Sequence, residues 1–478
     1  MNRSLISYIL GKVMQMIAAL LLLPCIVAIY YQESSGYSFL FTAVLCVTLG
    51  TLLSLKKPKV MELYPKDGLV ITALAWIIIS LLGAIPFTLS GEIPNYIDAL
   101  FETISGFTTT GATILDDVEA LSHACLMWRS FTHWIGGMGV LVFLMSILSL
   151  AGGNNMYLMK AESPGPSVGK LMPKVKHSAR MLYIIYIVLT ILQILLLLLS
   201  GMPFFHAMTL SFGTAGTGGF GILNSSIASY TQLQQGIITV FMLLFGVNFS
   251  LYFLIYTRKF KECLKNEEVK WYFRIFFFAV ILIVINSYSN FNSLLDAVHH
   301  VAFQVSSIMT TTGYATCDFA QWPMFSQMIL LLLMFVGASA GSTGGGMKVS
   351  RIVILFKALK KEIDYLVHPR RVKPITSDGV TVDKSIIKSI TTFFFCYMIL
   401  IFGSTLLLTL NNLDLATNFS AVVSAVGNIG PGLSKVGPTF SFSLFSPFEK
   451  IVLMFDMLAG RLELFPMLIL FFPSTWKK

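Results

Sequence analysis

Long apolar runs separated by short polar segments dominate the pattern along the chain. Ten of these runs are close to or above the length of about 20 residues that a helix needs to cross a bilayer. They lie at 5–31, 37–55, 69–90, 122–150, 181–201, 233–257, 271–289, 325–350, 386–410 and 447–472. Because lipid offers no hydrogen-bond partners, a spanning backbone must bond internally as a helix or a closed barrel. Unbroken runs favour the helix, so the pattern predicts an all-α polytopic membrane protein with about ten transmembrane helices.

Composition changes the estimate that length alone would give. A chain of 478 residues would suggest about three soluble domains. However, 55% of the residues are hydrophobic, only 12% are charged and the mean hydropathy is +0.78, whereas an ordinary soluble domain is about 25% charged. The six cysteines are far apart without paired spacing, so we expect them to pack in the core rather than form disulfides or a zinc site.

The basic residues predict how the chain is oriented. Its 33 lysines and arginines produce a net charge of +10, but they are spread over many short loops, so no nucleic-acid partner is expected. With the N-terminus inside, 29 of the 33 fall on or near the inner side, and the others are Arg129, Lys435, Lys450 and Arg461. This distribution satisfies the positive-inside rule and predicts that both termini are cytoplasmic.

The acidic residues show the complementary pattern. Eleven of the 23 fall on the predicted outer side: Glu33, Glu92, Asp98, Glu102, Asp116, Asp117, Glu119, Asp296, Asp318, Asp414 and Glu449. With only three bases on that side, such a face would concentrate cations at its mouth. For any single carboxylate, ordinary solvation of a loop is the alternative.

Four outer segments between predicted helices are apolar yet too short to cross, which is typical of re-entrant hairpins that line a water-filled cavity. They align as 98–111 (DALFETISGFTTTG), 206–219 (HAMTLSFGTAGTGG), 302–313 (AFQVSSIMTTTG) and 417–430 (TNFSAVVSAVGNIG). Phe101 and Phe303 each precede the last glycine of their segment by ten positions. The repeat predicts four pseudo-symmetric helix–pore loop–helix units around one pore, at 67–160, 176–262, 268–362 and 383–478, with an extra helix pair at 1–66.

The residue types of these loops indicate a cation filter. A permeating cation must exchange its hydration shell for oxygen ligands, and backbone carbonyls supply them without fixed charge. Glycine permits the backbone angles that turn carbonyls to one side, and the negative ends of short helices entering from outside would favour a cation such as potassium. The candidate filter residues are Thr109, Thr110, Gly111, Thr217, Gly218, Gly219, Thr311, Thr312, Gly313, Asn428, Ile429 and Gly430. Small-residue packing between helices is the alternative.

A second glycine-rich run interrupts the eighth predicted span. Residues 337–348 (GASAGSTGGGMK) have too little side chain to remain a stable helix. Irregular backbone at this depth must be buried in protein or face water, which would put it in the conduction path; a tight glycine seam between helices is the alternative. The candidate gate residues are Gly337, Gly341, Gly344, Gly345, Gly346, Lys348 and Arg461.

Arg461 lies with Asp456 and Glu463 inside the last apolar run. A charge within the membrane is costly unless it is paired or faces water, so it indicates a functional site. We expect Arg461 to be a fixed positive barrier in the pore. Neutralisation by Glu463 or Asp456 in a structural network is the alternative.

The four ordered loops, with Gly-Gly-Phe in the second and Asn-Ile-Gly-Pro-Gly in the fourth, resemble the Trk/Ktr/HKT cation transporters, and within them the TrkH/TrkG branch of bacteria, over the whole chain. The extra N-terminal pair favours that branch. Glycine in all four loops, including Gly111 where sodium-conducting members have serine, implies potassium uptake across the bacterial inner membrane. The resemblance also implies an intramembrane gate in the third unit, an arginine barrier in the last helix, a homodimer and regulation by a cytosolic ring of TrkA-like nucleotide-binding subunits.

Other function classes find little support. No nucleotide-binding loop, dinucleotide fingerprint or metalloprotease motif is present, so we expect no enzyme activity and no prosthetic group besides the transported potassium ion. The main alternative is a secondary transporter coupled to protons or sodium, which would predict inverted repeats rather than four units of one orientation. Channel-like and proton-coupled movement of the cation both stay open.

Overall fold

The computed structural model describes residues 2–58, 64–139, 175–370 and 374–476. Its helices are α1 (Arg3–Leu20), α2 (Leu22–Tyr31), α3 (Gly36–Ser54), α4 (Pro65–Leu89), α5 (Tyr96–Phe107), α6 (His123–Gly137), α9 (Val175–Leu199), α10 (Phe204–Gly216), α11 (Gln232–Phe245), α12 (Phe249–Tyr256), α13 (Phe260–Lys265), α14 (Glu267–Ser287), α15 (Leu294–Met309), α16 (Met324–Val336), α17 (Val349–Val367), α18 (Lys384–Leu408), α19 (Leu415–Gly427), α20 (Pro447–Arg461), α21 (Phe465–Leu468) and α22 (Pro473–Trp476). The described strands, β1 (Thr376–Ser377) and β2 (Val380–Thr381), form one antiparallel hairpin in which Thr376 pairs with Thr381. Short 3₁₀ turns lie at Tyr288–Asn290, Phe319–Gln321, Thr409–Asn411, Ser434–Val436, Phe442–Leu444 and Ile469–Phe471.

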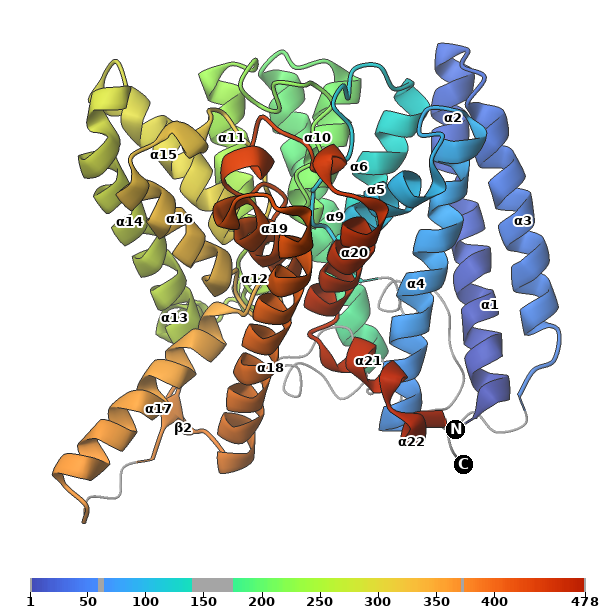
Figure 1. Cartoon of the computed structure of the whole chain (residues 1–478). Helices are drawn as coiled ribbons and strands as arrows, with labels where there is room; N and C mark the ends of the chain where they lie inside the picture. Colours follow the sequence, from blue (N-terminus) through green and yellow to red (C-terminus); the bar gives the residue numbers. More distant parts are fainter. Residues whose placement is uncertain (1, 59–63, 140–174, 371–373, 477–478) are drawn as a thin grey trace.

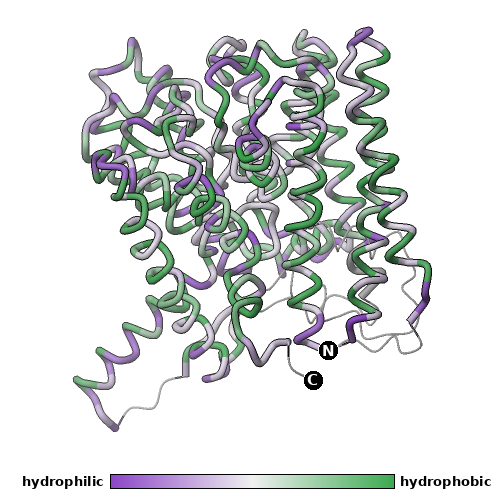
Figure 2. Tube along the Cα trace, turned by 45° about the vertical axis from the view of Figure 1, so that its right-hand side comes forward, coloured by the Kyte–Doolittle hydropathy of each residue, from purple (hydrophilic) through white to green (hydrophobic). Residues whose placement is uncertain are grey.

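The helical, membrane-spanning class is confirmed, whereas the count of ten spans stays a prediction. By length and composition, five helical segments of the described residues could cross a membrane, or six if α11 and α12 are one span; α1 and α2 together form one of the five, Arg3–Tyr31. Long helices such as α3 and α18 expose apolar side chains, for example Leu52 and Leu406. Figure 2 shows hydrophobic residues along most of the long helical segments. Such surfaces suit lipid rather than water. The last part of the fourth predicted span, 140–150, and the end of the first unit up to 160 lie outside the described residues.

Besides the eighth, whose glycine-rich run was expected to interrupt it, two predicted spans are not continuous helices. The sixth, 233–257, bends by 90° between α11 and α12, where the Asn248 side chain caps the new helix by accepting from the Ser250 amide at 2.9 Å. The tenth, 447–472, ends as a regular helix at Arg461. There Glu463 and Leu464 take positive φ angles, and Pro466 follows, which cannot continue a helix because it lacks an amide hydrogen and its ring clashes with the preceding turn.

Four short helices enter the body between the longer ones. α5 packs against α4 and α6, α10 against α9 and α6, α15 against α14 and α11, and α19 against α18 and α20. α1 and α3 pack against each other at one side of the molecule (Figure 1). They are in close contact at Gly11 and Gly50, where a β-carbon on Gly11 would lie 2.6 Å from the Gly50 carbonyl oxygen, as expected for small-residue packing in membranes.

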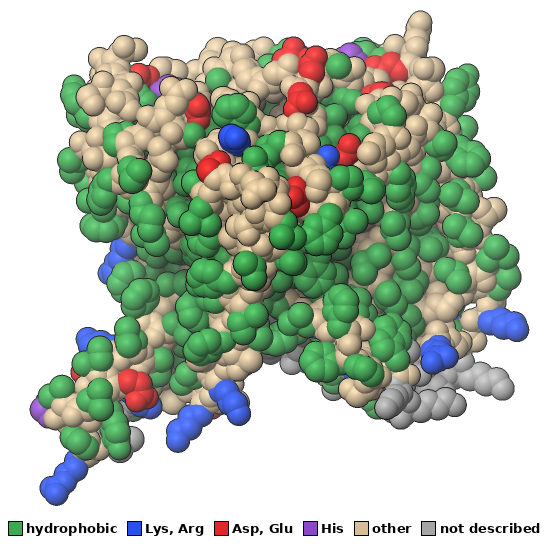
Figure 3. Space-filling view, in the orientation of Figure 1, with side chains coloured by type: hydrophobic (Ala, Val, Ile, Leu, Met, Phe, Trp, Pro, Cys, Tyr) green, Lys and Arg blue, Asp and Glu red, His purple; other side chains and the backbone are tan. Residues whose placement is uncertain are grey.

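Charge is separated along the long axis of the molecule. Figure 3 shows most acidic side chains near the upper end and mainly basic ones around the lower end. The N- and C-termini lie together at that lower end, and the helix α17 and the β1–β2 hairpin extend below the body beside it (Figure 1). The observed separation follows the distribution expected from the loop charges.

Candidate functional site

The four segments that follow the short helices share one backbone geometry. Each contains a non-glycine residue in the left-handed region: φ is 56° at Thr109, 54° at Thr217, 59° at Thr311 and 54° at Asn428. Two positions later each has a glycine with positive φ: 79° at Gly111, 78° at Gly219, 86° at Gly313 and 104° at Gly430. We call these segments loops 1 to 4 (108–111, 216–219, 310–313 and 427–430). The shared angles mean that the backbone turns in the same way in all four loops after the short helices.

The four loops close into a ring through contacts at their glycines. A β-carbon on each glycine would collide with the carbonyl oxygen of the residue before the glycine of another loop. The distances would be 1.9 Å from Gly111 to Gly218 O, 1.9 Å from Gly219 to Thr312 O, 2.2 Å from Gly313 to Ile429 O and 2.8 Å from Gly430 to Thr110 O. The contacts therefore run from loop 1 to 2, 2 to 3, 3 to 4 and 4 back to 1. All twelve residues predicted for the filter lie in this glycine ring.

Hydrogen bonds between side-chain hydroxyl and amide groups hold the loops in place; we call such a pair of bonded threonines within one loop a brace. In loop 1 the hydroxyls of Thr108 and Thr110 are 2.8 Å apart, and in loop 3 Thr310 and Thr312 repeat the same pair at 2.8 Å. The Asn428 amide of loop 4 donates to Thr110 Oγ1 at 3.0 Å. The repeated Thr-Thr-Thr-Gly string therefore has a structural reason, because its first and third hydroxyls bond to each other.

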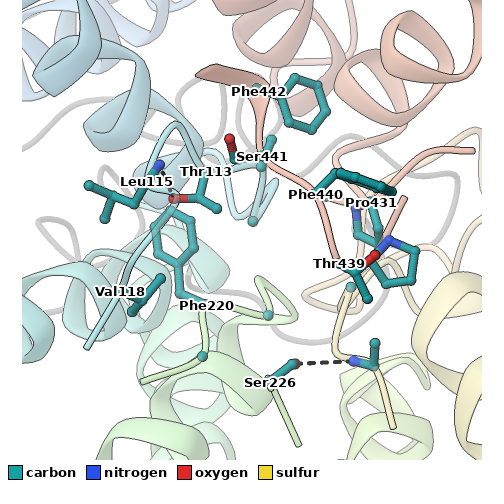
Figure 4. Close-up of a pocket in the computed structure, with 18 of the residues that line it drawn as sticks. Thr113, Leu115, Val118, Phe220, Ser226, Pro431, Thr439, Phe440, Ser441 and Phe442 are labelled. Carbon is teal, nitrogen blue, oxygen red and sulfur yellow. Dashed lines mark hydrogen bonds between the residues drawn. The ribbon is translucent and has the colours of Figure 1, made fainter. Parts of the chain in front are cut away.

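A cavity of about 720 Å³ opens directly above the ring and is lined by all four of its glycines. Figure 4 shows Phe220 and Val118 on one side of this cavity and Pro431, Thr439 and Phe440 on the other. The pocket does not match the expected acid-rich mouth, because Asp116 is the one acid among its described lining residues, beside the bases Arg129 and Lys435. The hydroxyls of Ser441 and Ser443 both donate to Asp116.

Most other outer carboxylates of the described chain are occupied by local bonds. Glu33 accepts from the amides of His123 and Ala124 at the start of α6, and Glu449 completes the capping box of α20. Asp98 pairs with Lys450 at 2.6 Å. Asp414 caps α19, and the hydrogen bond from the Thr417 hydroxyl lowers the pKa of this carboxyl below its usual value. These acids stabilise helix ends, which the count of charges could not reveal.

The glycine-rich segment 337–348 lies beneath the ring, between α16 and α17, and it is irregular as predicted. The Gly345 amide donates to Thr311 Oγ1 of loop 3 at 2.6 Å. A β-carbon on Gly344 would lie 2.8 Å from Thr310 O, and one on Gly345 would lie 2.4 Å from Gly427 O of loop 4. The segment is therefore irregular, and its glycines are also tightly packed. Gly344 and Gly345 pack against loops 3 and 4 of the ring.

The same segment occupies the break between α11 and α12. The Ser339 amide donates to Gly246 O at 3.0 Å, and the Phe249 amide donates to Gly341 O at 3.0 Å. The Glu268 carboxylate at the start of α14 accepts from the amides of Ala340 at 2.7 Å and Ser350 at 3.1 Å. The break between α11 and α12 and segment 337–348 therefore supply hydrogen-bond partners to each other's backbone groups. Sequence reasoning missed Glu268, and only its place in the first turn of an apolar helix could have drawn attention to it.

Two cations hold carbonyl groups around this segment. Arg461 donates to Thr343 O at 2.8 Å, and across to Gly136 O at 2.5 Å and Gly137 O at 2.8 Å on α6. Lys348 donates to Gly344 O. The remaining predicted gate residues, Gly337, Gly341 and Gly346, take φ angles of 71°, 72° and 72° in the same segment.

The acids suggested as partners of Arg461 have other partners. Glu463 forms an ion pair with Arg351 of α17, and Asp456 accepts from the Ser404 hydroxyl of α18 at 2.7 Å. The contacts of Arg461 with Thr343, Gly136 and Gly137 instead join α20, segment 337–348 and α6. Its guanidinium therefore bridges three parts of the chain immediately below the ring.

Comparison with known proteins gives consistent matches over the whole chain. The family model described as "TrkH: Cation transport protein" matches residues 35–478. The Trk system potassium uptake proteins TrkH and TrkG of Escherichia coli K12 are 35% and 34% identical to this chain, each over 99% of it and over 99% and 98% of their own lengths. The crystal structure of the potassium transporter TrkH from Vibrio parahaemolyticus superposes with a TM-score of 0.89 at 32% identity, covering 100% of both chains. The chain therefore belongs to the TrkH family of cation transport proteins and is a membrane transporter rather than an enzyme.

Proposed function

We propose that this protein is a potassium-uptake pore in which the glycine ring is the selectivity filter. The closed ring of four loops is the observation that carries the proposal, because it brings backbone carbonyl groups from four parts of one chain together. Carbonyl oxygens replace the hydration shell of a cation without binding it too tightly for release. The C-terminal ends of α5, α10, α15 and α19 lead into the ring, and their partial negative charge favours a cation. The relatives, a Trk system potassium uptake protein and a potassium transporter, support that ion.

The proposal extends to a gate formed by segment 337–348, with Lys348 and Arg461 as its fixed charges. The segment contacts loops 3 and 4 from below, so an ion leaving the ring would meet it. Its bonds to Arg461, Glu268 and the broken sixth span hold this closed position. Opening requires these bonds to break together. Such a cooperative change is typical of an element that switches between two arrangements rather than deforming gradually.

Sidedness, assembly and regulation complete the proposal. The basic lower end and the positive-inside rule support cytoplasmic termini in a bacterial inner membrane. The family resemblance supports a homodimer and a cytosolic TrkA-like nucleotide-binding partner. The helix α17 starts at the end of the gate segment and runs to this lower end (Figure 1), so a partner bound there could act on the gate directly.

The purified full-length protein in liposomes tests this function. Tracer uptake of potassium and of sodium is measured with and without a proton gradient. We expect potassium uptake to exceed sodium uptake, and to follow the potassium gradient in the absence of a proton gradient. Uptake that requires a proton or sodium gradient would support the coupled-transporter alternative, and equal uptake of the two ions would reject a potassium filter.

A further inference from the structure

Loop 2 of the glycine ring lacks the brace that holds loops 1 and 3. The braced positions, three and one before the final glycine, are Thr108 and Thr110 in loop 1 but Gly216 and Gly218 in loop 2. Without hydroxyl groups, loop 2 cannot form the same pair. Yet it must hold its carbonyls in the same ring, so another part of the chain has to position it.

Helix α6 occupies the space that these two glycines leave. A β-carbon on Gly218 would lie 2.2 Å from Nδ1 of His133, and one on Gly216 would lie 2.2 Å from the His133 backbone oxygen. The His133 side chain is fully buried. Loop 2 therefore has glycine where loops 1 and 3 have threonine because the imidazole of His133 stands there instead.

His133 bonds to the residue that directly follows loop 2 and to the helix before loop 1. Its Nδ1 lies 2.7 Å from Gly106 O of α5, and its Nε2 lies 3.2 Å from the Phe220 amide nitrogen. A carbonyl oxygen only accepts and an amide N–H only donates, so these partners assign a neutral imidazole with its proton on Nδ1. The ring also lies against the Phe220 ring, with centroids 4.2 Å apart.

Arg129, one turn before His133 on α6, makes a second set of bonds to the same segments. Its Nη1 donates to Gly221 O at 3.1 Å, and its guanidinium carbon lies 4.1 Å from the centre of the Phe220 ring. Its Nε donates to Glu102 of α5 at 2.7 Å in an ion pair whose side chains are 2% and 0% exposed.

Glu102 in turn secures the chain that leaves loop 1, by accepting from Thr113 Oγ1 at 2.9 Å and from the Ile114 amide at 3.1 Å. The matching position of the third unit is Gln304, and those of the second and fourth are Leu210 and Ala421. Among the four units, only the first therefore has a carboxylate at this position.

We propose that Arg129 and His133 are positioning residues, together an α6 clamp, that fix loop 2 against loop 1 and thereby set the discrimination between potassium and sodium. The inference rests on the proposed role of the ring as a potassium filter. Phe220 and Gly221 directly follow Gly219, so their bonds to α6 set where the loop 2 carbonyls stand. Discrimination depends on the size of the site and on the number and strength of its carbonyl ligands. Releasing the clamp therefore affects sodium rejection before it affects potassium passage.

The test uses His133→Phe and Arg129→Lys in the full chain, reconstituted in liposomes. His133→Phe keeps a ring beside Phe220 but removes both hydrogen bonds. Arg129→Lys keeps a charge near Glu102 but loses the planar fork that also reaches Gly221. We expect each variant to lower the potassium-to-sodium permeability ratio by about tenfold, the scale of one lost hydrogen bond to a charged or buried group, while potassium uptake persists.

Asp98→Asn is the matched control. Asp98 lies one turn before Glu102 on α5 and also pairs with a base, Lys450, but none of its bonds among the described residues reaches a loop of the ring. It should keep the wild-type ratio. Folding of each variant is checked by its monodispersity and melting temperature in detergent.

The outcomes separate the two proposals. Folded clamp variants with the wild-type ratio would overturn the α6 clamp and leave the filter intact. If the wild type itself does not discriminate, the proposed function fails and the clamp fails with it. If one variant does not fold, the other decides, and His133→Asn is measured beside it, because its shorter amide can reach Gly106 O but not the Phe220 amide. An unchanged ratio in these variants would also reject the clamp.

Discussion

Each glycine of the ring meets two demands at once. It has a positive φ angle, and the carbonyl oxygen of another loop occupies the place of a side chain. The first demand alone costs a residue with a β-carbon about 1–2 kcal/mol. The second cannot be met at all without moving the carbonyl that would bind the ion. At the scale of single residues, the glycines are therefore required by the packing of the ring as well as by their own backbone.

Gly111→Ala is expected to abolish potassium selectivity, because its β-carbon would lie 1.9 Å from Gly218 O. Gly91→Ala is the matched control: φ is also 79° at Gly91, but among the described atoms nothing lies within 4 Å of a β-carbon there. This control should lose about 1 kcal/mol of stability and keep its selectivity. Potassium and sodium fluxes in liposomes measure the difference. Similar selectivity in both variants would show that the carbonyl contact is unimportant.

Arg461→Ala is expected to raise cation flux several-fold. The change removes a positive charge below the ring and three hydrogen bonds that join α20, the gate segment and α6. Arg461→Gln separates the two effects, because the amide retains one donor group but carries no charge. Tracer uptake with matched protein amounts measures both variants. Unchanged or lower flux in well-folded Arg461→Ala would reject the barrier.

At the scale of elements, the proposed gate consists of two breaks that complete each other. A helix interrupted inside the membrane exposes backbone groups that lipid cannot bond. Here the break between α11 and α12 and segment 337–348 exchange hydrogen bonds at Gly246, Phe249 and Gly341. Neither break would be stable alone, so a movement of one is expected to involve the other.

Glu268→Ala is expected to increase basal potassium uptake. Its carboxylate accepts from two amides, those of Ala340 and Ser350, and their loss leaves buried N–H groups unbonded in the closed position. The neighbour Glu267 is the control, because its carboxylate bonds to Lys357 of α17 instead. Glu267→Ala should change uptake less. Equal effects of the two substitutions would mean that charge at the start of α14, rather than the bond to the gate segment, is responsible.

At the scale of the whole molecule, acidic and basic side chains gather at opposite ends, while local bonds occupy many of the acids. The upper end holds most of the acids (Figure 3), yet many of these carboxylates cap helices or pair with bases, and Asp116 alone among the described acids lines the cavity above the ring. Electrostatic attraction of cations to this end therefore depends on the summed field of the face.

Sidedness can be measured with a thiol reagent that does not cross membranes. Thr381 on β2 and Ser229 after loop 2 are both exposed. In intact cells we expect Ser229→Cys to react and Thr381→Cys to react only after permeabilisation. The unsubstituted chain, with its six native cysteines, gives the background. The opposite pattern would reverse the proposed orientation.

Much of this architecture could be predicted from particular residues. The Thr-Thr-Thr-Gly strings and the matched glycines located the loops of the ring, because a positive φ angle leaves a clear mark in a sequence. The run 337–348 was correctly expected to be irregular for the same reason. The breaks within 233–257 and 447–472 were missed, because hydropathy measures apolar length and is insensitive to a single cap such as Asn248 or to Pro466.

What the sequence determined by itself is the class of protein, its spans in outline, its charge asymmetry and the four repeated loops. These follow from composition, periodicity and local backbone preference, which neighbouring residues decide. Only the tertiary structure decided which carbonyl meets which glycine, that Arg461 joins α6 to the gate segment rather than pairing with Glu463 or Asp456, and that His133 fills the place of the missing threonines of loop 2. Those contacts join residues tens to hundreds of positions apart, and no local preference encodes such a pairing.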